Sequence, residues 1–375
     1  MTAQLFTPYR LGQLELANRI VVAPMCQYSA DDGSMNDWHM IHLGGLSLSG
    51  AALLFVEATG VEREGRITAG CVGLYSDENE QALARVIAAC RKWGHTKLGI
   101  QLGHAGRKGS AQQPWKGGRS VPANQPDGWQ TSGPSALALA DGWQTPHEFT
   151  SADLQRVADA FVAATHRAVR LGFDVLELHA AHGYLLHQFL SPLSNHRTDQ
   201  YGGSLENRLR FPLETYAAMR EIWPRNKPFG VRLSATDWVE GGWDLEQSIV
   251  FTMALQELGC DFIDVSSGGT DPAARVPAVP GYQVPFAAAI KARTNMPTMA
   301  VGMIIEPEHA EAIIARGEAD LIAFARAMLD NPRWPWHAAI RLGAKHAYPP
   351  QYERAVEKYW APAQRYAAPL LKAAE

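Results

Sequence analysis

Short apolar runs alternate along the chain with longer segments in which apolar residues recur every three or four positions. The runs suit strands buried on both faces of a parallel sheet, and the longer segments suit helices with one apolar face. Eight runs predict strands at residues 19–22, 53–57, 98–101, 175–178, 230–233, 262–265, 298–300 and 321–324. A regular strand–helix alternation of this kind predicts an α/β fold with a parallel sheet.

The helix between the third and fourth strands has clear signals at both ends. Apolar residues from Leu154 to Val169 recur at helical spacing and form one face. Thr150 and Asp153 have the spacing of a capping box, and Gly172 fits the stop after the last turn. The sequence therefore predicts a helix bounded by these two signals.

Eight strand–helix units in a chain of 375 residues favour a single-domain (β/α)8 TIM barrel over an open doubly wound sheet. The turn after the first strand lacks a Gly-x-Gly-x-x-Gly pattern, which argues against the open sheet. We assign residues 1–345 to the barrel and 346–375 to a C-terminal extension. The segment 107–146 is rich in Gly, Pro, Ser and Trp without a long period, so we predict a loop that caps the barrel mouth, with a short hairpin near 132–139.

Composition narrows the classes of partner. Hydrophobic residues make up 46% of the chain and the net charge is -4, with no run of Lys and Arg, so nucleic acid and membrane are poor partners. The start of the chain does not resemble a signal peptide, and we expect a cytoplasmic location. The four cysteines, Cys26, Cys71, Cys90 and Cys260, are widely spaced and are expected to be free thiols.

The fourth strand leads into His179, His182 and Tyr184, where a barrel enzyme places its chemistry. Two histidines could bind a metal ion, but such sites add ligands from other strand ends, and none is well placed here. They could also form a structural network. As a third interpretation, neutral imidazoles hydrogen-bond a carbonyl oxygen while the phenol delivers a proton, which is chemistry suited to an enone.

Polar residues after other strands point to a bound cofactor. Cys26 follows the first strand, Gln101 ends the third, and Arg232 is a permanent cation on an apolar strand that needs an anion. Gly302 and Arg326 follow the seventh and eighth strands, whose loops often bind phosphate in barrels. Together they predict a phosphorylated planar cofactor.

Three motifs stand out in the chain: Pro24-Met25-Cys26-x-Tyr28, His179-x-x-His182-Gly-Tyr184 and the stretch from Ser191 to Arg208. They resemble the old yellow enzyme family, in its thermophilic-like class that includes bacterial xenobiotic reductases, and the resemblance extends from about Leu5 to Arg354. It implies a barrel that holds FMN noncovalently. NADPH or NADH would reduce the FMN and leave before an electron-poor alkene, such as an α,β-unsaturated carbonyl compound, binds over the same flavin face.

The resemblance also implies roles for individual residues. The positions that it places against FMN are strand ends: Ala23, Pro24, Met25, Cys26, Ala58, Gln101 and Arg232 at the ring or ribityl chain, and Gly302, Ala325 and Arg326 at the phosphate. His179 and His182 would hold the substrate carbonyl while hydride from flavin N5 reaches the β-carbon, and Tyr184 would protonate the α-carbon. Cys26 would tune the flavin potential and touch the substrate, and Tyr28 would line the pocket.

The end of the chain and the stretch from Ser191 to Arg208 have different roles. Arg354 resembles a residue that enters the active site of a neighbouring subunit, which implies a homodimer or homotetramer. The residues from Val356 onward depart from the short aromatic ending that the family implies. Trp360 could therefore form this wall of the substrate pocket instead of Arg354. We interpret the stretch from Ser191 to Arg208 as structural, with a turn at Gly202-Gly203 and locally paired charges.

Three rival functions remain. A flavin reductase of dienoyl thioesters would need an iron–sulfur segment and further domains, which four scattered cysteines do not fit. A metal-dependent hydrolase would use His179 and His182 as ligands, whereas our interpretation includes no metal. A flavin-based redox sensor would use Cys26 without turning over an alkene.

Overall fold

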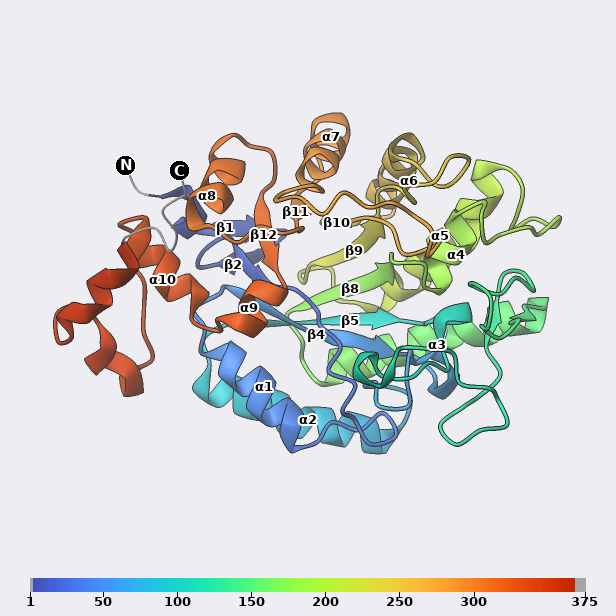
Figure 1. Ribbon diagram of the computed structural model, residues 1–375, viewed down its shortest axis with the longest axis horizontal. Helices are drawn as coiled ribbons and strands as arrows, with labels where there is room; N and C mark the ends of the chain where they lie inside the picture. The colour runs from blue at the N-terminus through green and yellow to red at the C-terminus, as the bar shows by residue number, and fades with distance from the viewer. Residues whose placement is uncertain (1–2, 368–375) are drawn as a thin grey trace.

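The computed structural model describes residues 3–367, and its centre is a closed barrel of eight parallel strands in the order β3, β4, β5, β8, β9, β10, β11, β12 (Figure 1). The strands are β3 (Ile20–Val22), β4 (Leu53–Gly60), β5 (Lys97–Gly103), β8 (Val175–Ala180), β9 (Phe229–Ser234), β10 (Ile263–Ser266), β11 (Thr298–Ala300) and β12 (Leu321–Phe324). Each overlaps a predicted strand. The predicted (β/α)8 barrel is confirmed.

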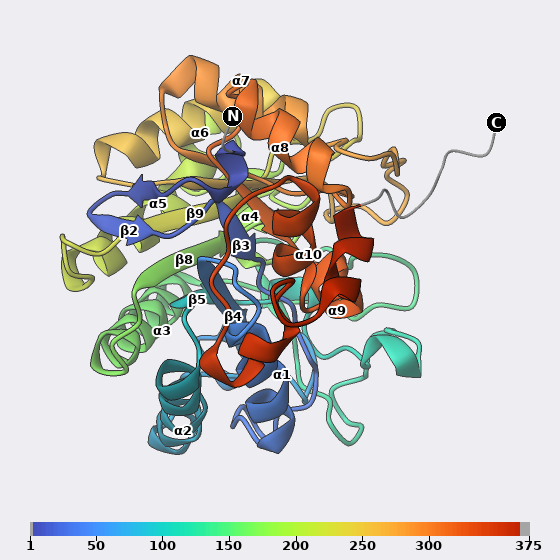
Figure 2. The ribbon, with the colours of Figure 1, turned by 90° about the vertical axis from the view of Figure 1, so that its left-hand side faces the viewer.

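Helices surround the barrel, as Figure 2 shows when the molecule is viewed toward one end. They are α1 (Asp37–Ser47), α2 (Asp77–Trp93), α3 (Ser151–Arg170), α4 (Leu185–Leu190), α5 (Leu205–Ile222), α6 (Leu245–Glu257), α7 (Val284–Thr294), α8 (Pro307–Ala315), α9 (Arg326–Asp330) and α10 (Trp334–Arg341). The predicted capping box of α3 is confirmed, because the side chains of Thr150 and Asp153 each accept a hydrogen bond from the other's backbone N–H. No helix in residues 3–367 is long and apolar enough to cross a membrane.

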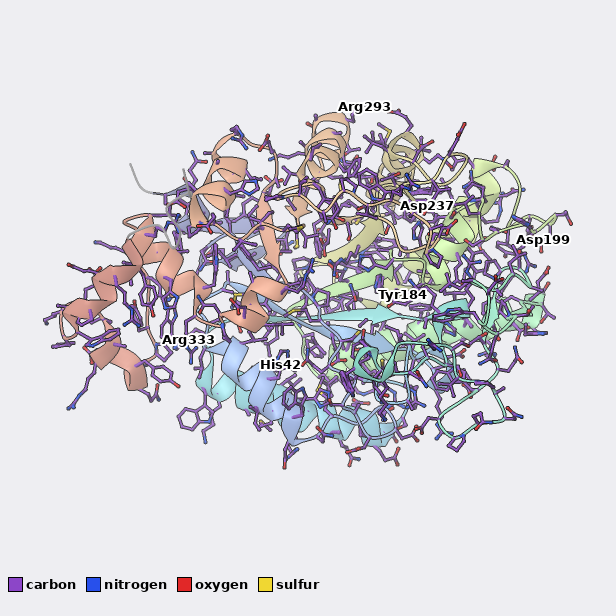
Figure 3. All side chains as sticks on the ribbon, viewed as in Figure 1. His42, Tyr184, Asp199, Asp237, Arg293 and Arg333 are labelled. Atoms are coloured by element: carbon purple, nitrogen blue, oxygen red, sulfur yellow. The ribbon has the colours of Figure 1, made fainter. Side chains whose placement is uncertain are left out.

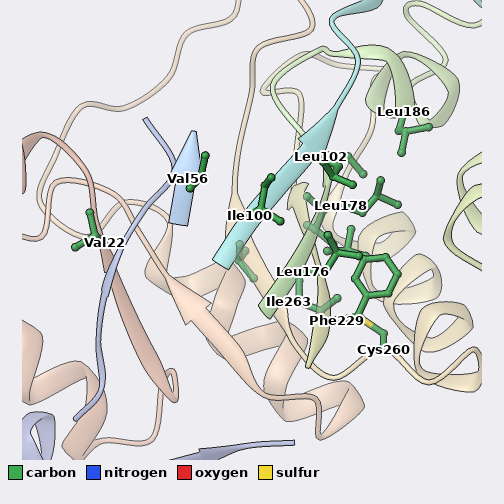
Figure 4. Close-up of a cluster of buried hydrophobic side chains, with 14 of the residues drawn as sticks. Val22, Val56, Ile100, Leu102, Leu176, Leu178, Leu186, Phe229, Cys260 and Ile263 are labelled. Atoms are coloured by element: carbon green, nitrogen blue, oxygen red, sulfur yellow. The ribbon is translucent and has the colours of Figure 1, made fainter. Parts of the chain in front are cut away.

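The side chains of each strand point alternately outward and inward, and this divides the apolar core into two layers. Outward residues such as Val22, Ile100, Leu176 and Leu178 pack beneath the helices (Figure 4). Inward residues, including Val21, Phe55, Val175, Phe262 and Met299, fill the barrel itself. Because successive side chains of a strand point to opposite faces, one continuous apolar run supplies both layers.

Two glycines make room for the aromatic rings inside the barrel. A Cβ at Gly99 would lie 2.5 Å from the ring of Phe55, and one at Gly230 would lie 2.5 Å from the ring of Phe262. The two rings lie 6.4 Å apart between centroids. This aromatic layer fills the barrel below the carboxyl ends of its strands. The polar side chains at the next inward positions therefore lie against an apolar layer.

An N-terminal hairpin, which the sequence did not predict, covers the other end of the barrel. Strands β1 (Tyr9–Leu11) and β2 (Leu14–Leu16) pair antiparallel, and Leu11 and Leu16 pack into the inner core. Strands of three residues are too short to show a period of two, which explains why the pattern did not reveal them.

The long segment after β5 contains only short elements, and the hairpin predicted near residues 132–139 is wrong. Strand β6 (Ser132–Gly133) pairs in parallel with β7 (His147–Glu148), so the residues between them form one wide loop. At the other end of the chain, the short helix η6 (Ala361–Ala367) packs on α10, where the rings of His337 and Tyr366 stack at 3.6 Å.

Candidate active site

The turn that follows β8 has an unusual backbone that sets the direction of the catalytic side chains. His182 and Gly183 both adopt left-handed conformations, with φ of +60° and +69°. A Cβ at Gly183 would lie 2.2 Å from the carbonyl oxygen of Gly269, so only glycine fits this approach. The N–H of His182 donates to Ser234 Oγ at 2.9 Å, which fixes the turn against β9.

Lys108 fastens the same turn from the opposite side. Its Nζ donates to the carbonyl oxygens of His182 at 2.7 Å and Gly269 at 2.8 Å, and it lies 5.1 Å from the centroid of the Tyr184 ring. Burial, and then the charge of Arg107, lower the pKa of Lys108 to about 8. A lysine at the base of the predicted cap loop therefore connects the ends of β8 and β10.

A buried hydrogen-bond network supports the turn from behind. The N–H of Gly183 donates to His187 Nδ1 at 2.9 Å, and His187 Nε2 lies 3.1 Å from Asp237 Oδ1. Ser191 Oγ donates to Asp237 Oδ2 at 2.6 Å. Figure 3 shows Tyr184 and Asp237 on the same side of the molecule, near α4. Tyr184 directly precedes α4, and this network restricts the conformation of its backbone.

The rings of His179, His182 and Tyr184 meet as predicted. The centroid of the His179 ring lies 5.1 Å from that of His182 and 5.0 Å from that of Tyr184, with the rings nearly perpendicular. Burial, and then the charge of Arg232, hold the pKa of both histidines well below its usual range. Burial raises the pKa of Tyr184 well above its usual range. The cluster therefore consists of two neutral imidazoles and a protonated phenol.

Hydrogen bonds to one nitrogen of each imidazole determine what the other nitrogen can do. Nδ1 of His179 accepts from the N–H of Ala181 at 3.3 Å, so Nε2 of His179 carries the proton and is free to donate. Nε2 of His182 lies 2.7 Å from Ser266 Oγ. Ser266 Oγ is also placed to donate to Gln283 Oε1 at 3.3 Å, and its single proton serves only one of these two bonds. When that proton is directed to Nε2 of His182, Nδ1 of His182 is a free donor.

Cys26 and Tyr28 lie on the loop after β3, which faces the same end of the barrel. Beside Cys26, the backbone N–H of Gln27 donates to Glu57 Oε2 at 3.0 Å, which ties the loop to β4. The Tyr28 ring contacts Trp115 from the cap loop at 6.0 Å between centroids, edge to face. The loop thus brings a thiol and a phenol from the predicted site to the barrel mouth.

A polar layer lies on the aromatic floor of the barrel. Gln101 Nε2 donates to Glu177 Oε1 at 2.8 Å, and Arg232 Nε lies 3.1 Å from Asp264 Oδ2. Sequence reasoning expected the cofactor to be the anion of Arg232, but Asp264 already provides a carboxylate. Burial, and then Asp264, raise the pKa of Glu177 well above its usual range, so this side chain is a neutral acid.

Several polar atoms of this layer remain without an aligned partner. Arg232 Nε, Glu177 Oε2 and Asp264 Oδ1 are buried and form no hydrogen bond to any residue in 3–367. Unsatisfied buried donors and acceptors cost free energy unless a ligand or water satisfies them. Their arrangement fits the polar edge of a flavin ring, which offers both carbonyl acceptors and ring nitrogens.

A cavity of about 410 Å³ opens beside this layer, between the ends of β10, β11 and β12. Gly302, Ala325 and Arg326 line it, as the predicted phosphate site requires. Gly302 has φ of +126°, and a Cβ there would lie 2.9 Å from Gln283 Nε2. The cavity and the exposed Arg326 side chain fit a phosphorylated group that enters from solvent.

The remaining predicted site residues lie on the loop after β3 and near the end of the chain. Ala23 is buried and donates its N–H to the carbonyl of Phe324, while Pro24 and Met25 are partly exposed. Arg354 is exposed on the short helix η5 (Pro350–Ala355), within the red C-terminal part of Figure 1, at the other side of the molecule from α4. Its predicted role in a neighbouring subunit stays a prediction.

Sequence reasoning missed four residues around the site. They are Lys108, Asp264, Ser266 and Cys71, and each reaches the predicted residues only through contacts between distant segments. Of the four, only Asp264 could have been found from the sequence. It is a charged residue in an otherwise apolar strand, which is the same feature that identified Arg232. Within residues 3–367, no group of three or more His, Cys, Asp and Glu side chains could hold a metal ion.

Residues 4–343 match the NADH:flavin oxidoreductase / NADH oxidase family. The chain belongs to this family. An NADPH dehydrogenase of Geobacillus thermodenitrificans is 42% identical over 94% of this chain and 99% of its own length. The resemblance to old yellow enzymes is thereby confirmed, and the chain is an oxidoreductase whose cofactors are FMN and a nicotinamide nucleotide.

Two solved structures extend the comparison of the family fold. A morphinone reductase in complex with tetrahydroNAD superposes with a TM-score of 0.74 at 29% identity, covering 92% of this chain and 93% of that one. A 2-naphthoyl-CoA reductase complex superposes with a TM-score of 0.81 at 25% identity, covering 92% of this chain but only 53% of that one. This chain spans about half the length of that reductase.

Proposed function

We propose that this protein is an NAD(P)H-dependent ene-reductase that reduces the C=C bond of α,β-unsaturated carbonyl and related electron-poor compounds. The observation that carries the proposal is the cluster of His179, His182 and Tyr184, in which two neutral imidazoles face a protonated phenol. Neutral N–H donors stabilise the negative charge that develops on a carbonyl oxygen, and a phenol with a raised pKa still carries its proton at neutral pH.

The chain's own residues divide the work on the substrate. Nε2–H of His179 donates to the carbonyl oxygen. Nδ1–H of His182 donates to it as well when the Ser266 proton is directed to Nε2 of His182 and not to Gln283 Oε1. Tyr184 O–H delivers a proton to the α-carbon. Tyr28 and Trp115 form a wall on the cap-loop side. Cys26 offers a free, partly exposed thiol on the same loop as Tyr28.

FMN, when bound, would supply the hydride for the β-carbon. Ala23 to Cys26, Ala58 and the polar layer of Gln101 and Arg232 would hold its ring and ribityl chain. Gly302, Ala325 and Arg326 would hold its phosphate, as the cavity that they line supports. The cytoplasmic location stays a prediction.

Anaerobic stopped-flow spectroscopy tests the proposal. Photoreduced holoprotein mixed with 2-cyclohexenone should return to the oxidised flavin spectrum, whereas a flavin-based redox sensor without alkene turnover would stay reduced. The substitution Tyr184→Phe should slow this half-reaction by roughly 10²-fold or more and leave reduction by the nucleotide much less affected. Equal slowing of both half-reactions would contradict the role of the phenol.

We also propose a homodimer or homotetramer in which Arg354 reaches the site of a neighbouring subunit. Its exposure on η5 and its position away from this chain's own α4 support a role outside the protomer. Size-exclusion chromatography with light scattering measures the assembly, and Arg354→Ala should raise the KM for the alkene without changing the flavin spectrum. A monomer with full activity would refute the proposal.

A further inference from the structure

A buried histidine and a buried aspartate lie behind the catalytic turn. His187 belongs to α4 and Asp237 to the loop after β9, and neither side chain is exposed to solvent (Figure 3). Neither lines the small cavity beside His179 and Tyr184 or the larger cavity at Gly302. Any part that these two residues play in the reaction must therefore act through other residues.

The contacts of His187 fix the position of its ring proton. The backbone N–H of Gly183 donates to Nδ1 at 2.9 Å, so Nδ1 carries no proton and Nε2 carries the only one. Nε2 lies 3.1 Å from Asp237 Oδ1. Thr270 Oγ1 lies 3.2 Å from Nδ1 and 3.4 Å from Nε2, and because Gly183 already occupies the lone pair of Nδ1, this hydroxyl can only accept from Nε2. The ring is thus the neutral tautomer with its proton on Nε2.

The carboxylate of Asp237 is held so that it cannot turn. Oδ2 accepts from Ser191 Oγ at 2.6 Å and from the backbone N–H of Trp243 at 2.8 Å. A Cβ at Gly242 would lie 2.9 Å from Oδ2, so glycine leaves the space that the carboxylate fills. Oδ1 is buried, has no aligned hydrogen-bond partner in residues 3–367, and is left beside Nε2 of His187. Its negative charge favours the tautomer with the proton on that nitrogen.

The same tautomer supports the catalytic turn. Gly183 is buried between His182 and Tyr184 in the chain, and its N–H needs an acceptor. Nδ1 of His187 supplies that acceptor only while it has no proton. A proton on Nδ1 would place two donors 2.9 Å apart, and the turn would have to move.

We propose that Asp237 is a positioning residue for the reduction step, because it sets the tautomer of His187, which in turn holds the catalytic turn in place. The consequence for the reaction rests on the proposed function, in which His182 and Tyr184 act on the substrate. Ser191, Asp237 and His187 do not form a nucleophilic triad, because Ser191 donates to the carboxylate and not to the imidazole.

The substitution Asp237→Asn should reverse the tautomer without changing the shape of the side chain. The backbone N–H of Trp243 can only donate, so the amide oxygen must face it, and the amide NH2 group is left facing Nε2 of His187. Nε2 must then accept, and the ring proton moves to Nδ1. The hydrogen bond from Gly183 is lost, although the altered residue lies outside the active site.

The direct test records two-dimensional ¹⁵N–¹H spectra of the histidine rings in the FMN-loaded protein, with His187→Gln used to identify one ring among the 13 histidines. The unaltered protein should show His187 with a proton on Nε2 and none on Nδ1, and Asp237→Asn should show the reverse. A doubly protonated ring or a proton on Nδ1 in the unaltered protein would overturn the proposal. Because that measurement uses the unaltered protein, a folding defect in the variants does not protect the proposal.

A double-mutant cycle tests whether Asp237 acts through His187. Asp237→Asn alone should slow flavin reoxidation by 2-cyclohexenone by roughly 10-fold to 10²-fold, because small displacements of catalytic groups cost rate. In a protein that already carries His187→Asn, the same substitution should have little further effect. Equal factors in the two backgrounds would overturn the proposal.

Asp320→Asn is a matched control at the opposite end of the barrel. Asp320 also accepts from a backbone N–H, that of Thr298 at 3.0 Å, and from Lys291 Nζ at 2.9 Å. This control should keep both the tautomer of His187 and the rate of reoxidation. If the unaltered protein has the expected tautomer but its reduced flavin does not react with 2-cyclohexenone, the proposed function fails and the control of His187 by Asp237 stands. If the alkene reacts and Asp237→Asn keeps both tautomer and rate, the positioning role alone is refuted.

Discussion

Replacing Gly183 by alanine tests whether the left-handed turn after β8 holds the catalytic side chains in place. A Cβ at this position would lie 2.2 Å from the carbonyl oxygen of Gly269, and contacts under 3.0 Å do not occur. That oxygen belongs to the backbone and accepts a hydrogen bond from Lys108 Nζ, so it cannot swing aside as a side chain would. The turn and the segment at Gly269 must therefore separate by about 0.8 Å.

The magnitude follows from two costs. An alanine in a left-handed conformation costs roughly 1–2 kcal/mol, and forced overpacking costs about 1–3 kcal/mol, so the free energy of unfolding should fall by about 2–5 kcal/mol. A displacement of about 1 Å of groups that must meet a substrate can cost 10²-fold in rate. We expect the alkene half-reaction of Gly183→Ala to slow by about that factor, because His182 and Tyr184 flank the displaced residue.

Gly203→Ala is a matched control for the backbone cost. Gly203 has φ of +80°, but no atom of the described residues 3–367 lies within 4 Å of the Cβ that alanine would add. The control should lose about 1–2 kcal/mol of stability and keep its rate of flavin reoxidation. Thermal unfolding and anaerobic stopped-flow with 2-cyclohexenone measure the two effects. The reasoning is refuted if Gly183→Ala reoxidises at the wild-type rate, or if Gly203→Ala slows as much.

Three further outcomes follow from the contacts described above. Thr150→Ala removes the capping box of α3 and should cost about 1 kcal/mol in thermal unfolding, with no change in flavin reoxidation. Burial lowers the pKa of Lys108 to about 8, so between pH 8 and about 10 the unfolded chain binds more protons than the folded protein. Denaturant titrations should therefore show that the stability of the wild type, relative to Lys108→Met, rises over this range. A difference that does not change with pH would contradict the burial of the ammonium group. Burial alone would raise the pKa of Asp237, but His187 and Ser191 hold it at about 2; relative to Asp237→Asn, the wild type's added stability should be complete above about pH 4 and lost as the pH falls toward 2.

The sequence by itself determined the barrel and the position of its chemistry. Each of the eight strands is an apolar run, and burial on both faces requires that composition wherever a strand lies between the inner core and a helix layer. The capping box at Thr150 and Asp153 was readable because it depends on residues three apart. His179, His182 and Tyr184 were found for the same reason, since they follow one strand within a few residues.

Only the tertiary structure decided which distant residues complete the site. The ion pair of Arg232 with Asp264 and the hydrogen bond of Lys108 to His182 each join segments with no shared local pattern. The proton positions on the imidazoles likewise depend on partners that the fold supplies, such as Ser266 for His182. Periodicity reports how one segment is buried, whereas these contacts depend on strand order, loop paths and register, which are properties of the closed barrel as a whole.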